Sequence, residues 1–123
     1  MKDERMVKLA NNLLTYSVNI QKGENLLIEI LGEDGLNLAK EITKRAKELG
    51  ARVYFNIIDY QLLRTTLENA EKEQIELYGK IDAERMKKMD AYIGIRATNN
   101  ISEMNGVSKE TMELYNKYYM EPV

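Results

Sequence analysis

The chain has 123 residues, of which 44% are hydrophobic and 31% charged; this composition is typical of one soluble globular domain and too apolar for disorder. The 18 lysines and arginines are interspersed among 20 aspartates and glutamates, so we expect no nucleic-acid partner. No stretch approaches the ~20 apolar residues of a membrane span and no signal peptide pattern opens the chain, so we expect no membrane association and a cytoplasmic location. Because histidine and cysteine are absent, disulfides and histidine-based triads are excluded, and zinc would need carboxylates alone.

Helices and strands alternate along the first half of the chain. Apolar residues at helical spacing predict an amphipathic helix over residues 5–18, and the near-continuous apolar run over residues 26–31 predicts a strand buried on both faces. We expect Asp34 to cap the next helix, which carries basic residues toward its end and stops at Gly50. Residues 51–58 then predict a second strand.

The second half continues this alternation with weaker patterns. Asp59 is expected to end the second strand and to cap a short helix. Residues 69–90 indicate two helices separated near Gly79, and residues 91–97 predict a third strand. A last helix is predicted from Ser108 onward, and its tyrosine cluster is more typical of a packing surface than of a stacking platform: Tyr115, Tyr118 and Tyr119.

The densest group of basic residues lies at the end of the 69–90 segment. It consists of Arg85, Lys87 and Lys88, and acidic residues flank it on both sides. Mixed charges of this kind are typical of a solvated helix face, which is how we interpret the group.

Strands separated by helices imply right-handed crossovers and a parallel sheet between helical layers. The sequence therefore predicts a single three-layer α/β/α domain over residues 1–123, with a small, mainly parallel sheet of the Rossmann-like or flavodoxin-like kind. Three strands make a thin sheet, and residues 121–123 end the chain where another strand would follow. We therefore expect a fragment of a longer protein.

The polar loop after the third strand is the first candidate for a site. Ligands of open α/β sheets bind outside the carboxyl ends of the strands, and Thr98, Asn99 and Asn100 follow such an end. The two asparagines suit either hydrogen bonds to a ligand or a tight turn. The sequence leaves both interpretations open.

Two acidic positions after the first and second strands are the other candidates. Asp34 and Asp59, together with Glu33, are placed like the acidic residues of a receiver domain, but no lysine ends the third strand. Helix capping is thus favoured over a magnesium site for both aspartates. The first strand is followed by LGEDGLN, which is no phosphate-binding glycine loop, so dinucleotide binding is disfavoured.

Three ordered segments carry a family resemblance: LANNLLTYSVNIQKGENLLIEI, LAKEITKRAKELGARVYFNI and MDAYIGIRATNNISEMNGVSKE. Their most telling positions are Tyr16, Ser17, Lys22, Gly23, Leu49, Gly50, Ala51, Asp90, Ala91, Arg96 and Asn100. In order and spacing they resemble the N-terminal domain of the thermophilic-type metalloaminopeptidases, the aminopeptidase T and S family. The likeness covers most of the chain.

The resemblance implies that this chain is the N-terminal part of a larger two-domain enzyme. Such a hydrolase releases N-terminal amino acids from peptides with two divalent metal ions, such as zinc or cobalt, held in its C-terminal portion. We accordingly assign no catalytic residue, metal ligand or cofactor to this chain and expect it to be inactive alone. Its implied partners are its own C-terminal catalytic portion, a peptide substrate and a second copy in a homodimer. Candidate cleft or interface contacts are Arg96, Thr98, Asn99, Asn100, Asp34 and Asp59.

Two other interpretations stay open at this point. The acidic positions and the loop from Thr98 to Asn100 also suit a stand-alone flavodoxin-like or receiver-like domain that binds a small ligand. The tyrosine-rich last helix also suits a structural module that forms oligomers.

Overall fold

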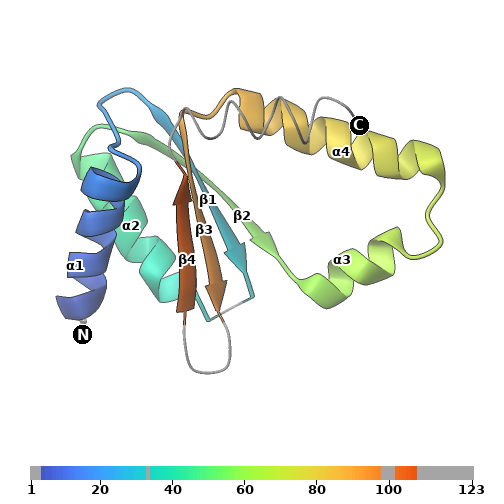
Figure 1. Ribbon diagram of the computed structural model, residues 1–123, viewed down its shortest axis with the longest axis horizontal. Coiled ribbons are helices and arrows are strands. Elements are labelled where there is room, and N and C mark those ends of the chain that lie inside the picture. Colours follow the sequence, from blue (N-terminus) through green and yellow to red (C-terminus); the bar gives the residue numbers. More distant parts are fainter. Residues whose placement is uncertain (1–3, 33, 98–101, 108–123) are drawn as a thin grey trace.

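The structure is a computed structural model that describes residues 4–32, 34–97 and 102–107, with the backbone alone for Ala97 and residues 102–107. Its centre is a sheet with the strand order β2-β1-β3-β4 (Figure 1). In chain order, the strands are β1 (Asn25–Leu31), β2 (Arg52–Ile58), β3 (Ala91–Ala97) and β4 (Ser102–Val107). Because β1 pairs in parallel with both β2 and β3, the predicted α/β fold with a small, mainly parallel sheet is confirmed.

Strand β4 departs from the sequence-based expectation. It pairs antiparallel with β3, with Tyr92 opposite Val107 and Ala97 opposite Ser102. The segment SEMNGV has no alternation of apolar and polar residues, so its sequence pattern does not predict a strand. The strand conformation of this segment therefore comes from its backbone pairing with β3 and not from a local preference of its residues.

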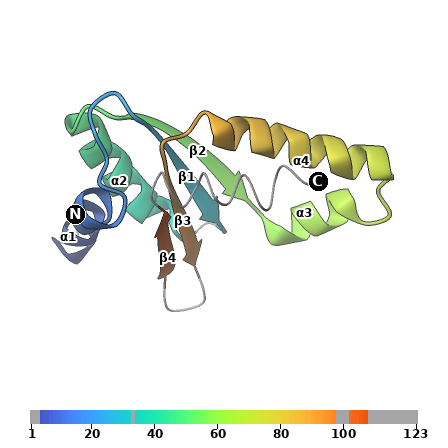
Figure 2. The same ribbon diagram turned by 45° about the horizontal axis from the view of Figure 1, so that its top comes forward.

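One face of the sheet is covered by α1 (Glu4–Asn12) and α2 (Leu36–Glu48), which lie on the same side of it (Figures 1 and 2). Alternate residues of the central strands point to this face, and among them Ile28 and Ile93 are completely buried. The π-helical turn η1 (Leu13–Ser17) extends α1, so the predicted first helix is confirmed with a wider last turn.

The start of α2 corrects one prediction. Gly35 is the N-cap residue, and the exposed Asp34 stands one position before it, so the expectation that Asp34 caps this helix is wrong. A Cβ atom on residue 35 would lie 2.6 Å from Cγ2 of Ile95, which shows how closely the chain passes β3 before the helix begins. The predicted end at Gly50, whose φ is +88°, is confirmed.

Helices α3 (Tyr60–Leu67) and α4 (Lys72–Lys87) form an arm that projects from the sheet, away from α1 and α2 (Figures 1 and 2). The backbone N–H of Leu62 donates to Oδ2 of Asp59 at 2.9 Å, so the predicted cap of α3 is confirmed. The expected break near Gly79 is wrong, because α4 runs through it without interruption. A glycine inside a helix costs about 1 kcal/mol relative to alanine, which does not suffice to end the helix.

Within the described ranges, no helix combines the length and the apolar character that a membrane crossing needs. The predicted helix from Ser108 and its tyrosines lie outside the described residues, as do Thr98, Asn99, Asn100 and Glu33.

Candidate functional site

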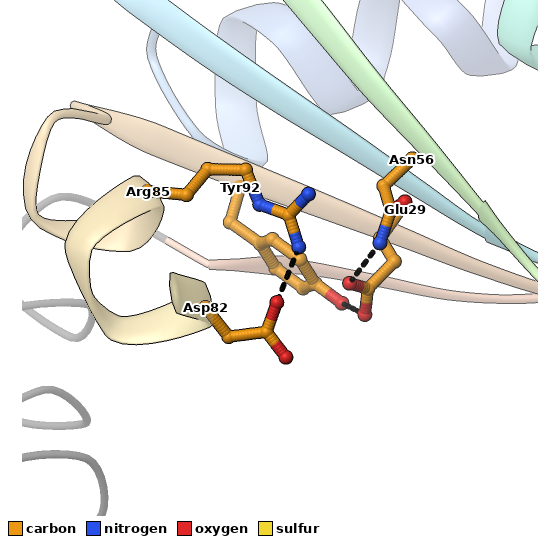
Figure 3. A network of polar contacts seen from close by, with 5 residues as sticks. All are labelled: Glu29, Asn56, Asp82, Arg85 and Tyr92. Atoms are coloured by element: carbon orange, nitrogen blue, oxygen red, sulfur yellow. Dashed lines mark hydrogen bonds and ion pairs between the residues drawn. The ribbon is translucent and has the colours of Figure 1, made fainter. Parts of the chain in front are cut away.

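A carboxylate stands in the middle of the most buried strand. Glu29 of β1 points to the sheet face opposite α1 and α2, because its neighbours Ile28 and Ile30 face the buried core. Its Oε1 accepts a hydrogen bond from the Tyr92 hydroxyl at 2.9 Å, and its Oε2 accepts a longer one from Nδ2 of Asn56 at 3.4 Å (Figure 3). Three strands thus each contribute one polar side chain to this hydrogen-bond network.

Gly94 gives Tyr92 the room to reach Glu29. Gly94 lies beside Glu29 in the β1–β3 register, two residues after Tyr92 on the same face. A Cβ atom at this position would stand 3.0 Å from the tyrosine hydroxyl and 3.2 Å from the ring. The missing side chain therefore lets the tyrosine lie along its own strand toward the carboxylate.

Helix α4 adds an ion pair above this face. Nη2 of Arg85 donates to Oδ1 of Asp82 at 2.6 Å, and both side chains are about one-third exposed (Figure 3). Burial raises the pKa of Asp82 above its ordinary value; the positive charge of Arg85 lowers it, and the negative charge of Glu29 raises it. The Nε of Arg85 is buried and has no hydrogen-bond partner among the described residues. The network thus holds one unused donor.

This ion pair corrects the interpretation of the basic group as a solvated face. Lys87 and Lys88 are exposed, but Arg85 is half-buried and bound to Asp82. Helical periodicity explains the difference, since Asp82 and Arg85 are three residues apart on the side of α4 that faces the sheet.

A cleft of about 330 Å³ opens beside the network, between the end of β2 and the two helices of the arm. We call it the arm cleft. Its polar lining comes from Asn56, Asp59, Thr66, Asp82 and Arg85. Its apolar lining comes from Ile57, Ile58, Leu62, Leu63, Tyr78 and Ile81. The charged groups of this lining have partners within the fold, since Asp82 pairs with Arg85 and Asp59 accepts from the Leu62 N–H.

A larger hollow of about 710 Å³ runs along the surface of α3. All its lining residues come from this one helix and the residue after it, and the polar network contributes none of them. We therefore assign the candidate site to the smaller arm cleft.

The structure brings only one of the sequence-predicted candidates to this cleft. Asp59 both caps α3 and lines the cleft. Arg96 is exposed at the carboxyl end of β3, opposite Leu31 in the register, and Asp34 is exposed before α2; neither lines the arm cleft. The remaining candidates, Thr98, Asn99 and Asn100, lie outside the described residues.

The sequence-based reasoning missed the network itself. The available signal is Glu29, which interrupts an otherwise apolar strand and needs a hydrogen-bonding partner when the strand is buried. Its partners are not identifiable by spacing, because Tyr92 lies 63 positions further along the chain.

The residues of the network do not fit a metal ion. Among the described residues there is no group of three or more metal-ligating side chains placed to hold one. Both carboxylates are already engaged, Glu29 by Tyr92 and Asn56, and Asp82 by Arg85. We therefore derive no metal-dependent step from this part of the chain.

Comparison with known proteins supplies the family. The family model described as thermophilic metalloprotease (M29) matches residues 2–121, in agreement with the resemblance seen in the three sequence segments. Among solved structures, wild-type AmpT from Thermus thermophilus is similar, with 21% identity and a TM-score of 0.48 over 68% of this chain and 22% of that one. This chain therefore spans less than a quarter of the AmpT chain. No curated protein matches it. Because the family model covers nearly the whole sequence, the chain belongs to the thermophilic metalloprotease family.

Proposed function

We propose that this chain is the N-terminal scaffold domain of a metal-dependent aminopeptidase that releases N-terminal amino acids from peptides in the cytoplasm. The observation that carries the proposal is the metalloprotease family match over residues 2–121. The chain contains no histidine, and its described residues include no metal-ligating group. In the proposed parent enzyme, a separate catalytic portion binds the two divalent ions, such as zinc or cobalt.

The role of a scaffold agrees with the energetics of the sheet. Its face under α1 and α2 is a continuous aliphatic core, which makes the parallel strands a rigid support. The carboxyl ends of β1, β2 and β3 lie at the same edge, where Asp59 and Arg96 are exposed. Asp34, Asp59 and Arg96 lie at or beside this edge and are candidate contacts to the catalytic portion or to the peptide. Thr98, Asn99 and Asn100 stay candidates from the sequence alone.

The test compares this chain with the complete natural reading frame. Both are purified without metal, supplied with zinc or cobalt, and assayed for release of free amino acids from short unblocked peptides. We expect metal-stimulated release by the complete protein, none by the 123-residue chain, and loss of activity on chelation. N-terminally acetylated peptides are the control, since an aminopeptidase requires the free amine.

Two results would contradict the proposal. The first is a complete protein that stays inactive with every divalent ion tested. The second is metal-stimulated release by the 123-residue chain itself, which would place the catalytic machinery within this sequence.

A further inference from the structure

Strand β2 presents an open edge. Among the described residues its neighbour in the sheet is β1, and it ends the strand order. The N–H of Arg52 donates to the carbonyl of Glu24, and the carbonyl of Ile58 accepts from Gly32, so the even-numbered residues turn their backbone groups toward β1. By the alternation of a strand, the N–H and C=O groups of the odd-numbered residues point outward. These residues are Val53, Phe55 and Ile57.

The side chains of the same three residues point to the face that carries α2. Phe55 is 67% exposed and Ile57 48% exposed, although both lie in register with the buried Ile28 and Ile30 of β1. A groove of about 500 Å³ lies here between β2 and α2, and we call it the edge groove. Its apolar and small lining residues are Ile30, Leu36, Ala39, Thr43, Phe55 and Ile57.

The edge lacks the features that prevent a strand from pairing. Proteins protect open edges with lysines, prolines or bulges in the edge strand. Apart from Arg52 at its start, β2 contains no charged residue, it contains no proline, and its register with β1 is unbroken. An additional strand therefore finds both unpaired backbone groups and an apolar surface to cover.

The charges of the groove select among the candidate strands. Lys40 and Lys44 of α2 complete the lining of the edge groove, and both are exposed. Lys44 forms an ion pair with Glu41 at 3.6 Å, and because the lysine side chain is 58% exposed it stays open to a second carboxylate. A second copy added by two-fold symmetry would bring its own lysines to the same face of the joined sheet. Acidic side chains of a partner are therefore attracted to these lysines, whereas the lysines of a second copy would repel them.

We propose that β2 binds an extended segment of a partner protein, which adds a strand to the sheet. Its backbone pairs with Val53, Phe55 and Ile57, its apolar side chains at alternate positions cover Phe55 and Ile57, and two acidic residues that follow on the same face meet the two lysines. Strand addition of this kind takes its affinity from main-chain hydrogen bonds and its specificity from the alternate side chains. The inference is independent of the aminopeptidase assignment.

The test uses a fluorescein-labelled seven-residue peptide and fluorescence anisotropy with the 123-residue chain. The peptide carries valine at its first and third positions, glutamate at its fifth and seventh, and serine at the other positions, so that one face holds the valines and the acids. We expect a saturable rise in anisotropy. Peptides with lysine in place of the glutamates, or with N-methylated backbone amides, should bind at least about tenfold more weakly.

Protein variants locate the binding site. The double variant Lys40→Glu with Lys44→Glu should weaken binding about tenfold, and Phe55→Ser should do so by removing the exposed aromatic surface. The matched control is Lys80→Glu with Lys87→Glu on α4, which changes the net charge equally and should leave the affinity unchanged. Circular dichroism confirms that each exposed substitution leaves the fold intact.

Four outcomes would overturn the proposal. The first is that the acidic peptide does not bind, and the second is that the lysine peptide binds equally well. The third is a concentration-dependent dimer that Phe55→Ser dissociates, which would make a second copy the occupant. The fourth is binding by this chain but not by the complete natural protein, which would show that another part of the same protein covers the groove.

Discussion

The two faces of the sheet are held by different interactions. The face under α1 and α2 is aliphatic, with Ile28, Ile42 and Ile93 completely buried. The opposite face carries the carboxylate of Glu29, the Tyr92 hydroxyl and the ion pair of α4. The first face needs only apolar residues at the right period, whereas the second needs particular partners from three separate segments. The aliphatic face is therefore stabilised by burial of apolar surface, whereas the polar face is held by specific hydrogen bonds and carries the candidate site.

The largest effect is expected from the aliphatic face. Ile28→Ala leaves a cavity in a close-packed core, and we expect the free energy of unfolding to fall by about 2–5 kcal/mol, measured by urea denaturation. The control is Ile75→Ala on α4, where the side chain is 47% exposed and the change should stay within about 0.5 kcal/mol. Equal losses of unfolding free energy at the two positions would contradict the difference in packing between the aliphatic face and the exposed arm.

The next effect concerns the polar face. Tyr92→Phe removes the hydroxyl that donates to Glu29 at 2.9 Å, and we expect a loss of about 1.5–3 kcal/mol, because the acceptor is a charged, part-buried group. Tyr16→Phe is the matched control, since Tyr16 is 85% exposed and should tolerate the change. If Tyr92→Phe leaves the free energy of unfolding unchanged, the network contributes no stability.

A smaller effect on stability should distinguish Asp59 from Asp34, both of which the sequence predicts as helix caps. Asp59→Ala removes the side chain that accepts from the Leu62 N–H, and it should cost about 1 kcal/mol in thermal or chemical unfolding. Asp34→Ala should cost almost nothing, because Gly35 occupies the cap position of α2. Similar costs for both substitutions would contradict the described start of α2.

The smallest effect is the pH dependence of Asp82. Because burial raises its pKa in the folded chain above the ordinary 3.8, the folded state binds more protons than the unfolded state between those two pKa values. The contribution of this group to the free energy of unfolding therefore falls as the pH rises from 3.8 through the folded pKa. Relative to Asp82→Asn, the wild-type chain should lose stability over this window and then level off in urea denaturation. A difference that stays constant with pH, or rises, would contradict the assignment.

Local sequence patterns predicted the aliphatic half of the molecule. Apolar periodicity identified β1 and the helix that ends at Gly50, because burial and local backbone preference act together there. The same reasoning failed for β4, whose residues SEMNGV form a strand only because β3 provides the pairing. It also failed at Gly79, where the continuity of α4 overrides one unfavourable residue.

The site was less predictable than the fold. Asp59 was identified because its capping partner is only three residues away. Glu29 is the one charged residue of β1, but its bonds to Asn56 and Tyr92 depend on the strand order, which no local pattern encodes. Long-range polar contacts of this kind require the structure.

The most direct test of the scaffold assignment is metal stoichiometry by equilibrium dialysis against zinc and cobalt. We expect the 123-residue chain to retain no metal, and the complete natural protein to retain two ions per chain and to lose them to a chelator. Stoichiometric metal retained by the 123-residue chain would contradict it, as would a complete protein that binds none.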